Sequence, residues 1–306
     1  MSDSLRILID AATDGGRNMA IDEALLHAVG RGLSGPTLRL YRWERATLSL
    51  GYSQKLAALA DQPLLVRSMP LVRRVTGGGA ILHDREMTYC LALPLADASA
   101  VGEIFCLAGA AADMYGRMHG FLAQAVDRLG RQGVATRPGF TAARLAGDAA
   151  ATDTAEGGGA TKADAGKPAR PTNAADGGCA TNMAQGEVRA GAAPAGKAFL
   201  CFERHSSLDL MMGGDKLAGS AQRRSKHALI QHGSLVLRSH PAQPSQAVER
   251  ITGRHITFEE MASALLSVLR AEGLELEHGQ LTQSESLLLP DLIEKHQSQA
   301  WVSRVV

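Results

Sequence analysis

The sequence predicts a mixed α/β domain, and three observations indicate it. Several segments alternate apolar and polar residues as strands do, and they lie on both sides of a long helical stretch at residues 101–130. A second helical pattern lies near the N-terminus, and the chain is again helical from residue 257 onward. At 306 residues the chain is long enough for one large domain or two modest ones. Strands, a long helix, more strands and terminal helices are typical of a mixed α/β fold.

The N-terminal part begins with a strand and a helix. Residues 5–10 (LRILID) form a short apolar run, and residues 18–30 (NMAIDEALLHAVG) have helical periodicity. We expect Asn18 to cap the first helical turn and Gly30 to end the helix. Strands are expected next at residues 36–43, 47–52, 71–75, 80–84 and 87–94. The alternation in the first two of these strands predicts that each is half-buried.

Three consecutive glycines, Gly77, Gly78 and Gly79, interrupt this series of strands in the stretch RRVTGGGAILHD (residues 73–84). Glycine is needed where a side chain would collide with something that approaches the backbone closely. Because strand-like sequence stands on both sides, the triglycine predicts a turn or kink within a sheet.

Residues 141–198 differ sharply in composition from the rest of the chain. They consist mainly of Ala, Gly, Asp and Thr, with almost no large apolar side chain. Such a segment cannot bury enough surface to offset the entropy cost of ordering it. We therefore expect a disordered insertion without a catalytic role.

Strand signals return after the insertion. Residues 208–212 and 215–224 are expected to form strands joined by a hairpin at Gly213 and Gly214, and residues 228–237 form a third strand. Farther on, Thr257 and Glu260 have capping-box spacing at the start of a helix. A second helix is expected around PDLIEKH, with Pro290 in its first turn.

Charge and hydropathy exclude two classes of partner. The 32 Lys and Arg residues nearly balance the 31 Asp and Glu residues, and a formal charge of +1 does not indicate a nucleic-acid partner. The chain does not begin with a basic region followed by an apolar core, and no run reaches the ~18 apolar residues of a membrane span. We expect a cytoplasmic protein with neither nucleic acid nor a membrane as partner.

The four cysteines show no metal-binding pattern. They form no Cys-x-x-Cys pair and have no metal-type spacing with histidine, so no metal site is expected. Cys90 and Cys106 are expected to be packing residues, and Cys179 lies in the insertion. The context of Cys201 is different, as the following comparison with a known family shows.

Three separated stretches, taken in order, resemble one family. They are NMAIDEALL, RRVTGGGAILHD, and DKLAGSAQRR with the later QHGSLVL. Together they are similar to the lipoate-ligase and octanoyltransferase branch of the biotin/lipoate protein ligases. The resemblance implies that family's catalytic-domain fold, formed by residues 1–140 and 199–245 and followed by a short helical segment at residues 246–306.

Two chemistries occur in this family. The ligases use ATP to make a lipoyl-adenylate, whereas the octanoyltransferases take octanoate already activated as a carrier thioester, and one type passes it through an enzyme cysteine. The stretch CFERHSSLDL (residues 201–210) resembles the cysteine-dependent octanoyltransferases, although His205 stands where proline is usual. The tail after Leu237 also resembles the short tail of the transferases.

The resemblance implies roles for individual residues. Cys201 is expected to be the acyl-thioester nucleophile, and Lys216 the cation that favours its thiolate and polarises the acyl carbonyl. A neutral Lys216 could also accept a proton from the incoming amine. Substrate-binding roles are implied for the glycine turn, its flanks and the lysine strand, namely Arg73, Arg74, Gly77, Gly78, Gly79, His83, Gly219 and Ser220.

Alternation directs only one of Arg73 and Arg74 toward the site, and the sequence leaves open which one. His83 and Asp84 are adjacent strand residues that point to opposite faces, so His83 is expected to line the pocket or anchor the turn. His232 is expected to be a structural hydrogen-bonding residue near the site.

The sequence thus predicts an octanoyltransferase of lipoic acid assembly that requires no cofactor. The expected donor is octanoyl-acyl carrier protein, and the expected acceptor is a lipoyl domain or the glycine-cleavage H protein. An ATP-dependent lipoate-protein ligase, which would require ATP and Mg²⁺, is one alternative. An octanoyl-H-protein amidotransferase and a non-catalytic acyl-binding module are the others.

Overall fold

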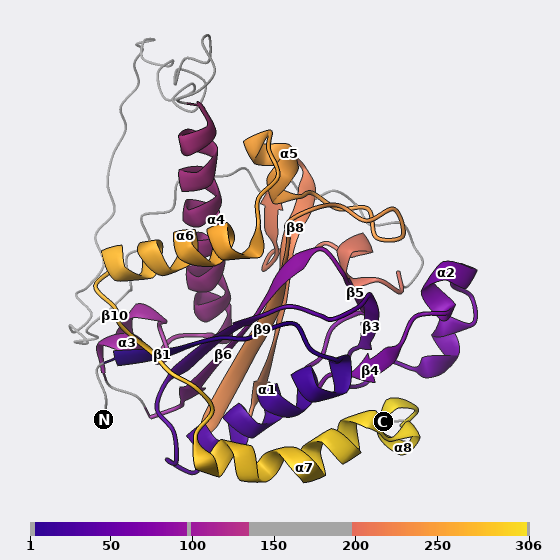
Figure 1. Ribbon diagram of the computed structural model, residues 1–306, viewed down its shortest axis with the longest axis horizontal. Coiled ribbons are helices and arrows are strands. Elements are labelled where there is room, and N and C mark those ends of the chain that lie inside the picture. Colours follow the sequence, from indigo (N-terminus) through magenta and orange to yellow (C-terminus); the bar gives the residue numbers. More distant parts are fainter. Residues whose placement is uncertain (1–3, 97–98, 135–197, 305–306) are drawn as a thin grey trace, which may run out of the picture.

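The computed structural model describes residues 4–96, 99–134 and 198–304. The insertion predicted at residues 141–198 lies outside these residues, apart from Ala198. Helices and two β-sheets make up the described part and confirm the mixed α/β class (Figure 1).

The main sheet has seven strands in the order β10-β1-β2-β6-β9-β8-β7. Strand β1 is parallel to both of its neighbours, and all the other pairs are antiparallel. The strands are β1 (Ser4–Ile9), β2 (Thr37–Tyr41), β6 (Glu86–Pro94), β7 (Leu210–Met212), β8 (Asp215–Arg224), β9 (Ala228–Val236) and β10 (Glu275–His278). The predicted hairpin between β7 and β8 is confirmed, with φ angles of 64° at Gly213 and 90° at Gly214.

The glycine turn belongs to a smaller three-stranded sheet. Strand β3 (Thr47–Leu50) lies in the middle, parallel to β4 (Leu71–Arg73) and antiparallel to β5 (Ile81–His83). The segment between β4 and β5, which contains the triglycine, therefore crosses from one edge of this sheet to the other. A 3-10 helix η1 (Leu56–Leu59) and helix α2 (Leu64–Arg67) connect β3 to β4.

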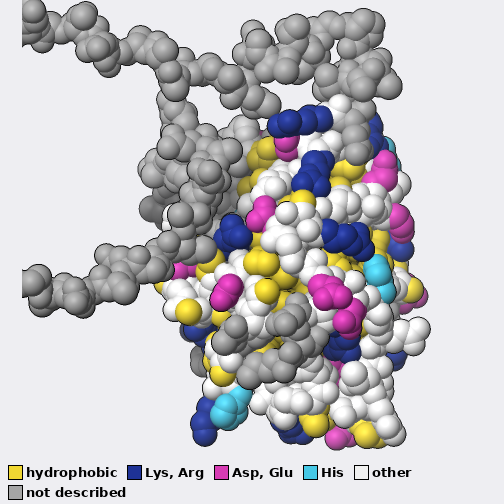
Figure 2. Space-filling view, turned by 90° about the vertical axis from the view of Figure 1, so that its left-hand side faces the viewer, with side chains coloured by type: hydrophobic (Ala, Val, Ile, Leu, Met, Phe, Trp, Pro, Cys, Tyr) yellow, Lys and Arg dark blue, Asp and Glu magenta, His cyan; other side chains and the backbone are white. Residues whose placement is uncertain are grey.

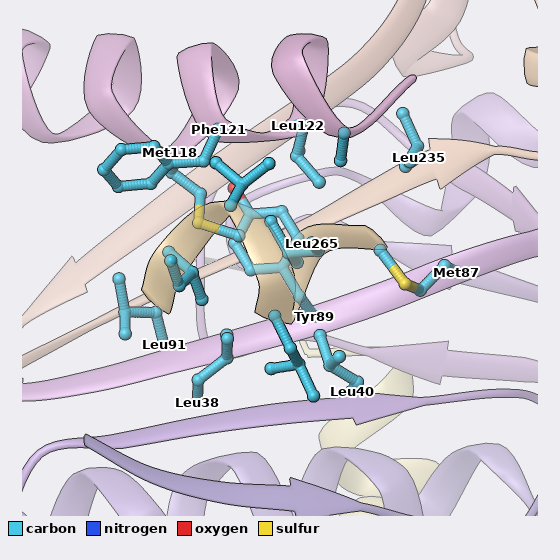
Figure 3. Close-up of a cluster of buried hydrophobic side chains, with 14 of the residues drawn as sticks. Leu38, Leu40, Met87, Tyr89, Leu91, Met118, Phe121, Leu122, Leu235 and Leu265 are labelled. Atoms are coloured by element: carbon cyan, nitrogen blue, oxygen red, sulfur yellow. The ribbon is translucent and has the colours of Figure 1, made fainter. Parts of the chain in front are cut away.

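Helices cover both faces of the main sheet (Figure 1). Helices α4 (Ala111–Val134) and α6 (Phe258–Ala271) enclose the larger apolar core, part of which is drawn in Figure 3. Helices α1 (Gly15–Gly30) and α7 (Gln283–Gln297) pack on the opposite side.

Strands β2 and β3 are not half-buried as predicted. All the residues of both strands are buried. Even Arg39 on β2 is fully buried, because it pairs with Asp10 and Asp22 at 2.7 Å. On β3, Ser49 is likewise buried and bonds His83 at 2.6 Å. Alternation of polar and apolar residues in these strands therefore reflects buried polar groups with partners, and not a solvent-exposed face.

Two helix predictions need correction. Helix α1 begins at Gly15, one turn earlier than expected, because the Asp14 side chain caps it by accepting from the Arg17 backbone N–H. Asn18 lies inside the helix and donates to the carbonyls of Thr13 and Arg42. The stretch at residues 101–130 is two helices, α3 (Ala100–Ile104) and α4, separated by a turn in which Cys106 has a φ of 54°.

The C-terminal part contains more elements than the sequence predicted. Thr257 and Glu260 form the expected capping box of α6. Helix α7 has its own capping box at Thr282 and Glu285, so Pro290 lies within the helix and not in its first turn. Strand β10, and the short helices α5 (Val248–Thr252) and α8 (Gln299–Val302), were not predicted.

On the face shown in Figure 2, Lys and Arg side chains are interspersed with Asp and Glu side chains. No helix in the described part of the chain has the length and apolar composition that a membrane crossing requires.

Candidate active site

The side chains of Cys201 and Lys216 meet beside the β7–β8 hairpin, close to its Gly213–Gly214 turn. Cys201 begins the 3-10 helix η3 (Cys201–Glu203), and its Sγ lies 3.4 Å from Nζ of Lys216. The Cys201 backbone N–H donates to the carbonyl of Ala80 at 2.6 Å, which attaches the cysteine to the end of the glycine turn. The structure therefore brings together the thiol, the ammonium and the triglycine segment.

Lys216 is held by acceptors on several sides. Its Nζ lies 2.9 Å from Oδ2 of Asp209 and donates to the carbonyls of Cys201 and Arg204 at 3.1 and 3.4 Å. The Lys216 side chain is only 2% exposed, so an unpaired ammonium would be costly there. Asp209 belongs to the stretch CFERHSSLDL, but its pairing with Lys216 was not predicted from the sequence. The signal that could have revealed it is that a buried lysine requires a nearby carboxylate.

A β-bulge directs Lys216 toward the cysteine. Leu210 pairs with Ala218 and Met211 with Lys216, so Leu217 is left without an opposite residue on β7. Such an insertion changes which face the neighbouring side chains take. As a result Lys216 lies on the same side of β8 as Gly219, where a Cβ would come within 2.6 Å of Lys216 Cε and 3.6 Å of Cys201 Sγ.

Backbone geometry within the protein requires two of the three glycines. A Cβ on Gly79 would lie 3.1 Å from the backbone N of Cys201 and 3.2 Å from its Cα. Gly78 has a φ of 92°, and its carbonyl oxygen occupies the place that a side chain on Gly51 would need. Gly77 has no neighbour within 4 Å of such a position. Close packing against Cys201 thus accounts for Gly79, and the positive φ accounts for Gly78, without a ligand.

Arg74 faces the glycine turn. Its guanidinium donates to the carbonyls of Gly77 and Gly79 at 3.0 and 2.9 Å, and to the Ser49 carbonyl at 2.8 Å. Burial lowers the pKa of Arg74 to about 10, while the nearby charge of Cys201 acts in the opposite direction. Arg74 therefore fixes the shape of the turn and places a positive charge near the thiol.

Arg73 points away from the thiol. Its side chain is fully buried and donates to the carbonyls of Gly51, Tyr52 and Gln54 at 2.8–3.0 Å, and to that of Val302 at 2.7 and 3.0 Å. These backbone acceptors occupy all three guanidinium nitrogens. Of the two arginines left open by the sequence, Arg74 is the one that contacts the turn.

Comparison with known proteins identifies the family. A model of the lipoyl protein ligase A/B catalytic domain matches residues 14–138, and a model of the biotin/lipoate A/B protein ligase family matches residues 173–239. An octanoyltransferase LipM from Kyrpidia tusciae is 30% identical over 311 residues, which cover 93% of each chain. The chain belongs to the biotin/lipoate A/B protein ligase family. The predicted family and fold are thereby confirmed.

A second relative has the same transferase name, whereas a solved ligase structure has the same fold. An octanoyltransferase LipM from Staphylococcus epidermidis is 27% identical and is matched over 94% of each chain. A crystal structure of lipoate-protein ligase A bound with ATP superposes with a TM-score of 0.58 at 18% identity and covers 100% of both chains. The fold alone therefore does not distinguish transferase from ligase.

Three residues that the sequence analysis named lie outside the contact between Cys201 and Lys216, and the first is His83. His83 bonds Ser49 Oγ at 2.6 Å, contacts Glu86 and stacks on Trp43 with ring centroids 3.9 Å apart. Because Ser49 in turn accepts from Arg74, His83 acts on the turn indirectly. It anchors the turn and does not touch Cys201.

Ser220 and His232 lie on opposite faces of the sheet. The Ser220 hydroxyl bonds Tyr89 at 2.6 Å and His119 at 2.7 Å, on the α4 side and away from Cys201. His232 contacts Thr76, the residue before the glycines, and lies 3.4 Å from Asp22. His232 is thus a buried structural partner of the turn.

The other described cysteines differ from Cys201. Cys90 and Cys106 are buried, and burial raises the pKa of the Cys90 thiol well above its usual value. Within the described residues, no group of three or more His, Cys, Asp and Glu side chains could hold a metal ion.

Proposed function

We propose that this octanoyltransferase of lipoate assembly carries the acyl group as a thioester on Cys201. The observation that carries the proposal is the 3.4 Å contact between Cys201 Sγ and Lys216 Nζ at the end of the glycine turn. A thiol becomes a nucleophile as its thiolate, which a neighbouring cation stabilises. Transfer to a lipoyl domain agrees with the family and with the names of the LipM relatives.

In the first step the Cys201 thiolate attacks the carbonyl carbon of an octanoyl thioester. The new C–S bond forms, the bond to the donor sulfur breaks, and the donor leaves as a thiolate. Negative charge develops on the carbonyl oxygen in between, and the Lys216 ammonium, 3.4 Å from the sulfur, would stabilise it. Asp209 and two backbone carbonyls hold that ammonium in place, so little reorganisation is needed.

In the second step the acceptor lysine attacks the Cys201 thioester as a neutral amine. An amide bond forms, one proton leaves the nitrogen, and Cys201 departs as a thiolate beside Lys216. The donor thiolate released in the first step accounts for that proton in the overall balance. Neither ATP nor Mg²⁺ enters this reaction, because the acyl group arrives already activated.

The proposed donor is octanoyl-acyl carrier protein, and the proposed acceptor is a lipoyl domain or the glycine-cleavage H protein. A ligase would need groups to bind a carboxylate and an adenylate phosphate. Arg73 and Arg74, the candidates for that role, are committed to backbone carbonyls instead. This commitment favours transfer over ligation. An amidotransferase that draws octanoate from the H protein would use the same cysteine, and donor competition distinguishes it.

Intact-mass spectrometry tests the cysteine route. The protein is incubated with octanoyl-acyl carrier protein, without ATP or acceptor. We expect an octanoyl adduct that hydroxylamine removes, that Cys201→Ala lacks, and that the control Cys90→Ala keeps. A wild-type protein without an adduct, which modifies the acceptor only with ATP and free acid, would instead be a ligase.

A further inference from the structure

Two arginines converge on one tyrosine at the far end of the glycine turn. The guanidinium carbon of Arg223, at the end of β8, lies 4.8 Å from the ring centroid of Tyr52, and that of Arg304 lies 4.4 Å from the same centroid. Arg304 also lies 4.6 Å from the ring of Trp301, which contacts Tyr52 edge-on at 6.1 Å. Two positively charged side chains therefore lie against the same aromatic ring.

The buried Arg73 fixes this cluster. It donates to the Tyr52 carbonyl on one side and to the Val302 carbonyl on the other, while Trp301 Nε1 donates to the Arg73 carbonyl at 3.0 Å. One guanidinium thus links the β3 end to the C-terminal helix α8, which Figure 1 shows beside β4. The position of Arg304 next to Tyr52 follows from these buried bonds.

Neither arginine of the cluster is neutralised within the described residues. No carboxylate there forms an ion pair with Arg223 or Arg304. Lys295, which also lies over Trp301, is different because it pairs with Glu23 at 2.6 Å. Desolvation would raise the pKa of Tyr52, but hydrogen bonding and charge from Arg223 and Arg304 lower it overall. The positive electrostatic potential at the Tyr52 ring therefore favours a negatively charged group there.

The cluster lies on the same face of the sheet as the thiol. Ala221 pairs with His232 and Arg223 with Ile230, and these β9 side chains face the turn and α1. Gly219 continues this face toward Lys216, so small residues separate the two ends of the site. Seven positions from Lys216 to Arg223 correspond to about 23 Å along a strand. Tyr52 is attached to the segment before the glycine turn, because its N–H donates to the Thr76 carbonyl at 2.8 Å.

We propose that Arg223 and Arg304 bind the phosphate of the donor's phosphopantetheine arm while the thioester at the other end of that arm meets Cys201. The inference rests on the proposed transferase function. An acyl chain would not end among charged guanidiniums, whereas a phosphate is a group that arginine binds through paired charge-assisted hydrogen bonds. The long polar pantetheine chain would then run over Gly219 and Ala221.

Three donors that differ in one feature each provide the test. Octanoyl-pantetheine lacks the phosphate, octanoyl-phosphopantetheine has it, and octanoyl-acyl carrier protein adds the protein. The rate of Cys201 acylation at low donor concentration is measured by intact mass for wild type, Arg223→Gln, Arg304→Gln and the double variant. Arg224→Gln is the control, because Arg224 is an exposed neighbour that alternation places on the opposite face.

We expect wild type and Arg224→Gln to prefer octanoyl-phosphopantetheine over octanoyl-pantetheine. Each single variant should reduce that preference about 10-fold, and the double variant should abolish it, since a charge-assisted hydrogen bond contributes at least this much to binding. The rate with octanoyl-pantetheine serves as an internal control for folding, because it should not change.

An unchanged preference in the double variant would overturn the proposal, as would an equal loss with both small donors. A loss confined to the carrier protein would also overturn it, and would assign the arginines to the carrier's acidic surface. Absence of any Cys201 adduct with all three donors would contradict the transferase function itself, which separates the two failures.

Discussion

The two faces of strand β8 differ in chemistry, although successive residues of the same strand form them. The face toward the glycine turn carries Lys216 and adjoins buried charges, such as Arg74 and the His232–Asp22 pair. On the face toward α4, Leu217 and Ala218 belong to the large apolar core, next to the hydrogen-bonded Ser220. Buried charges need oriented partners, whereas apolar groups need only filled space. We therefore expect substitutions on the first face to change the rate of transfer and those on the second to change stability.

Lys216→Met, on the face toward the glycine turn, should have the largest effect on the rate of transfer. The substitution removes the ammonium beside Cys201 but keeps most of the side-chain volume. Acylation of Cys201 should fall by about a thousandfold, within the range that such catalytic groups contribute. The rate is measured by intact mass on acylation reactions quenched at successive times. Lys226→Met is the control, because Lys226 is an exposed lysine between β8 and β9. A loss below tenfold would show that the thiol does not depend on this cation.

Phe121→Ala tests the opposite face. Phe121 is 1% exposed in the α4 core and packs edge-on against Phe105 with ring centroids 5.8 Å apart (Figure 3). Its removal should lower the free energy of unfolding by about 4 kcal/mol, as for other large-to-small core changes. Urea denaturation measures this loss, and the acylation rate of the folded fraction should stay within twofold of wild type. A much larger change in the acylation rate would contradict the expectation that substitutions on this face change stability alone.

His119 should make the α4 face sensitive to acid. Burial lowers its pKa to about 4, from an ordinary 6.5, and Lys216 also disfavours a charged ring. The unfolded chain binds this proton more readily, so stability is complete above pH 6.5 and is lost as the pH falls toward 4. The loss amounts to about 3 kcal/mol. Because burial also lowers the pKa of His232, its titration runs in the same direction.

Denaturation midpoints at several pH values test this prediction. His119→Gln should flatten the dependence between pH 6.5 and 4, and His27→Gln, a partly exposed histidine on α1, serves as the control. An unchanged slope in His119→Gln would mean that another group dominates this range.

Gly79→Ala should have the smallest effect of the four. The new Cβ would lie 3.1–3.2 Å from the Cys201 backbone, so the cysteine must move by a few tenths of an ångström. We expect about a tenfold slower acylation with little change in stability, since geometry matters more to the reaction than to the fold. Gly77→Ala, which meets nothing within 4 Å, should keep the wild-type rate. Equal rates for both variants would contradict the close-packing explanation.

Sequence patterns predicted those elements whose signals are local. The β7–β8 hairpin needs only two glycines, and the α6 capping box needs only Thr257 and Glu260. The patterns failed where distant segments decide. Strand β10 exists because β1 offers it a parallel edge, and the 101–130 stretch breaks where Phe105 packs onto Phe121. No local pattern contains that information.

The sequence by itself determined the fold class, the family and the two residues that we propose as the reactive pair, because these depend on short motifs that occur in order along the chain. Only the tertiary structure decided which groups surround that pair. Arg73 and Arg74 are neighbours in sequence, yet Arg73 fixes the C-terminal helix and Arg74 holds the glycine turn. The same holds for Arg304, which reaches Tyr52 from the other end of the chain. Buried polar groups must find acceptors wherever folding brings them, and that requirement joins residues which no sequence spacing connects.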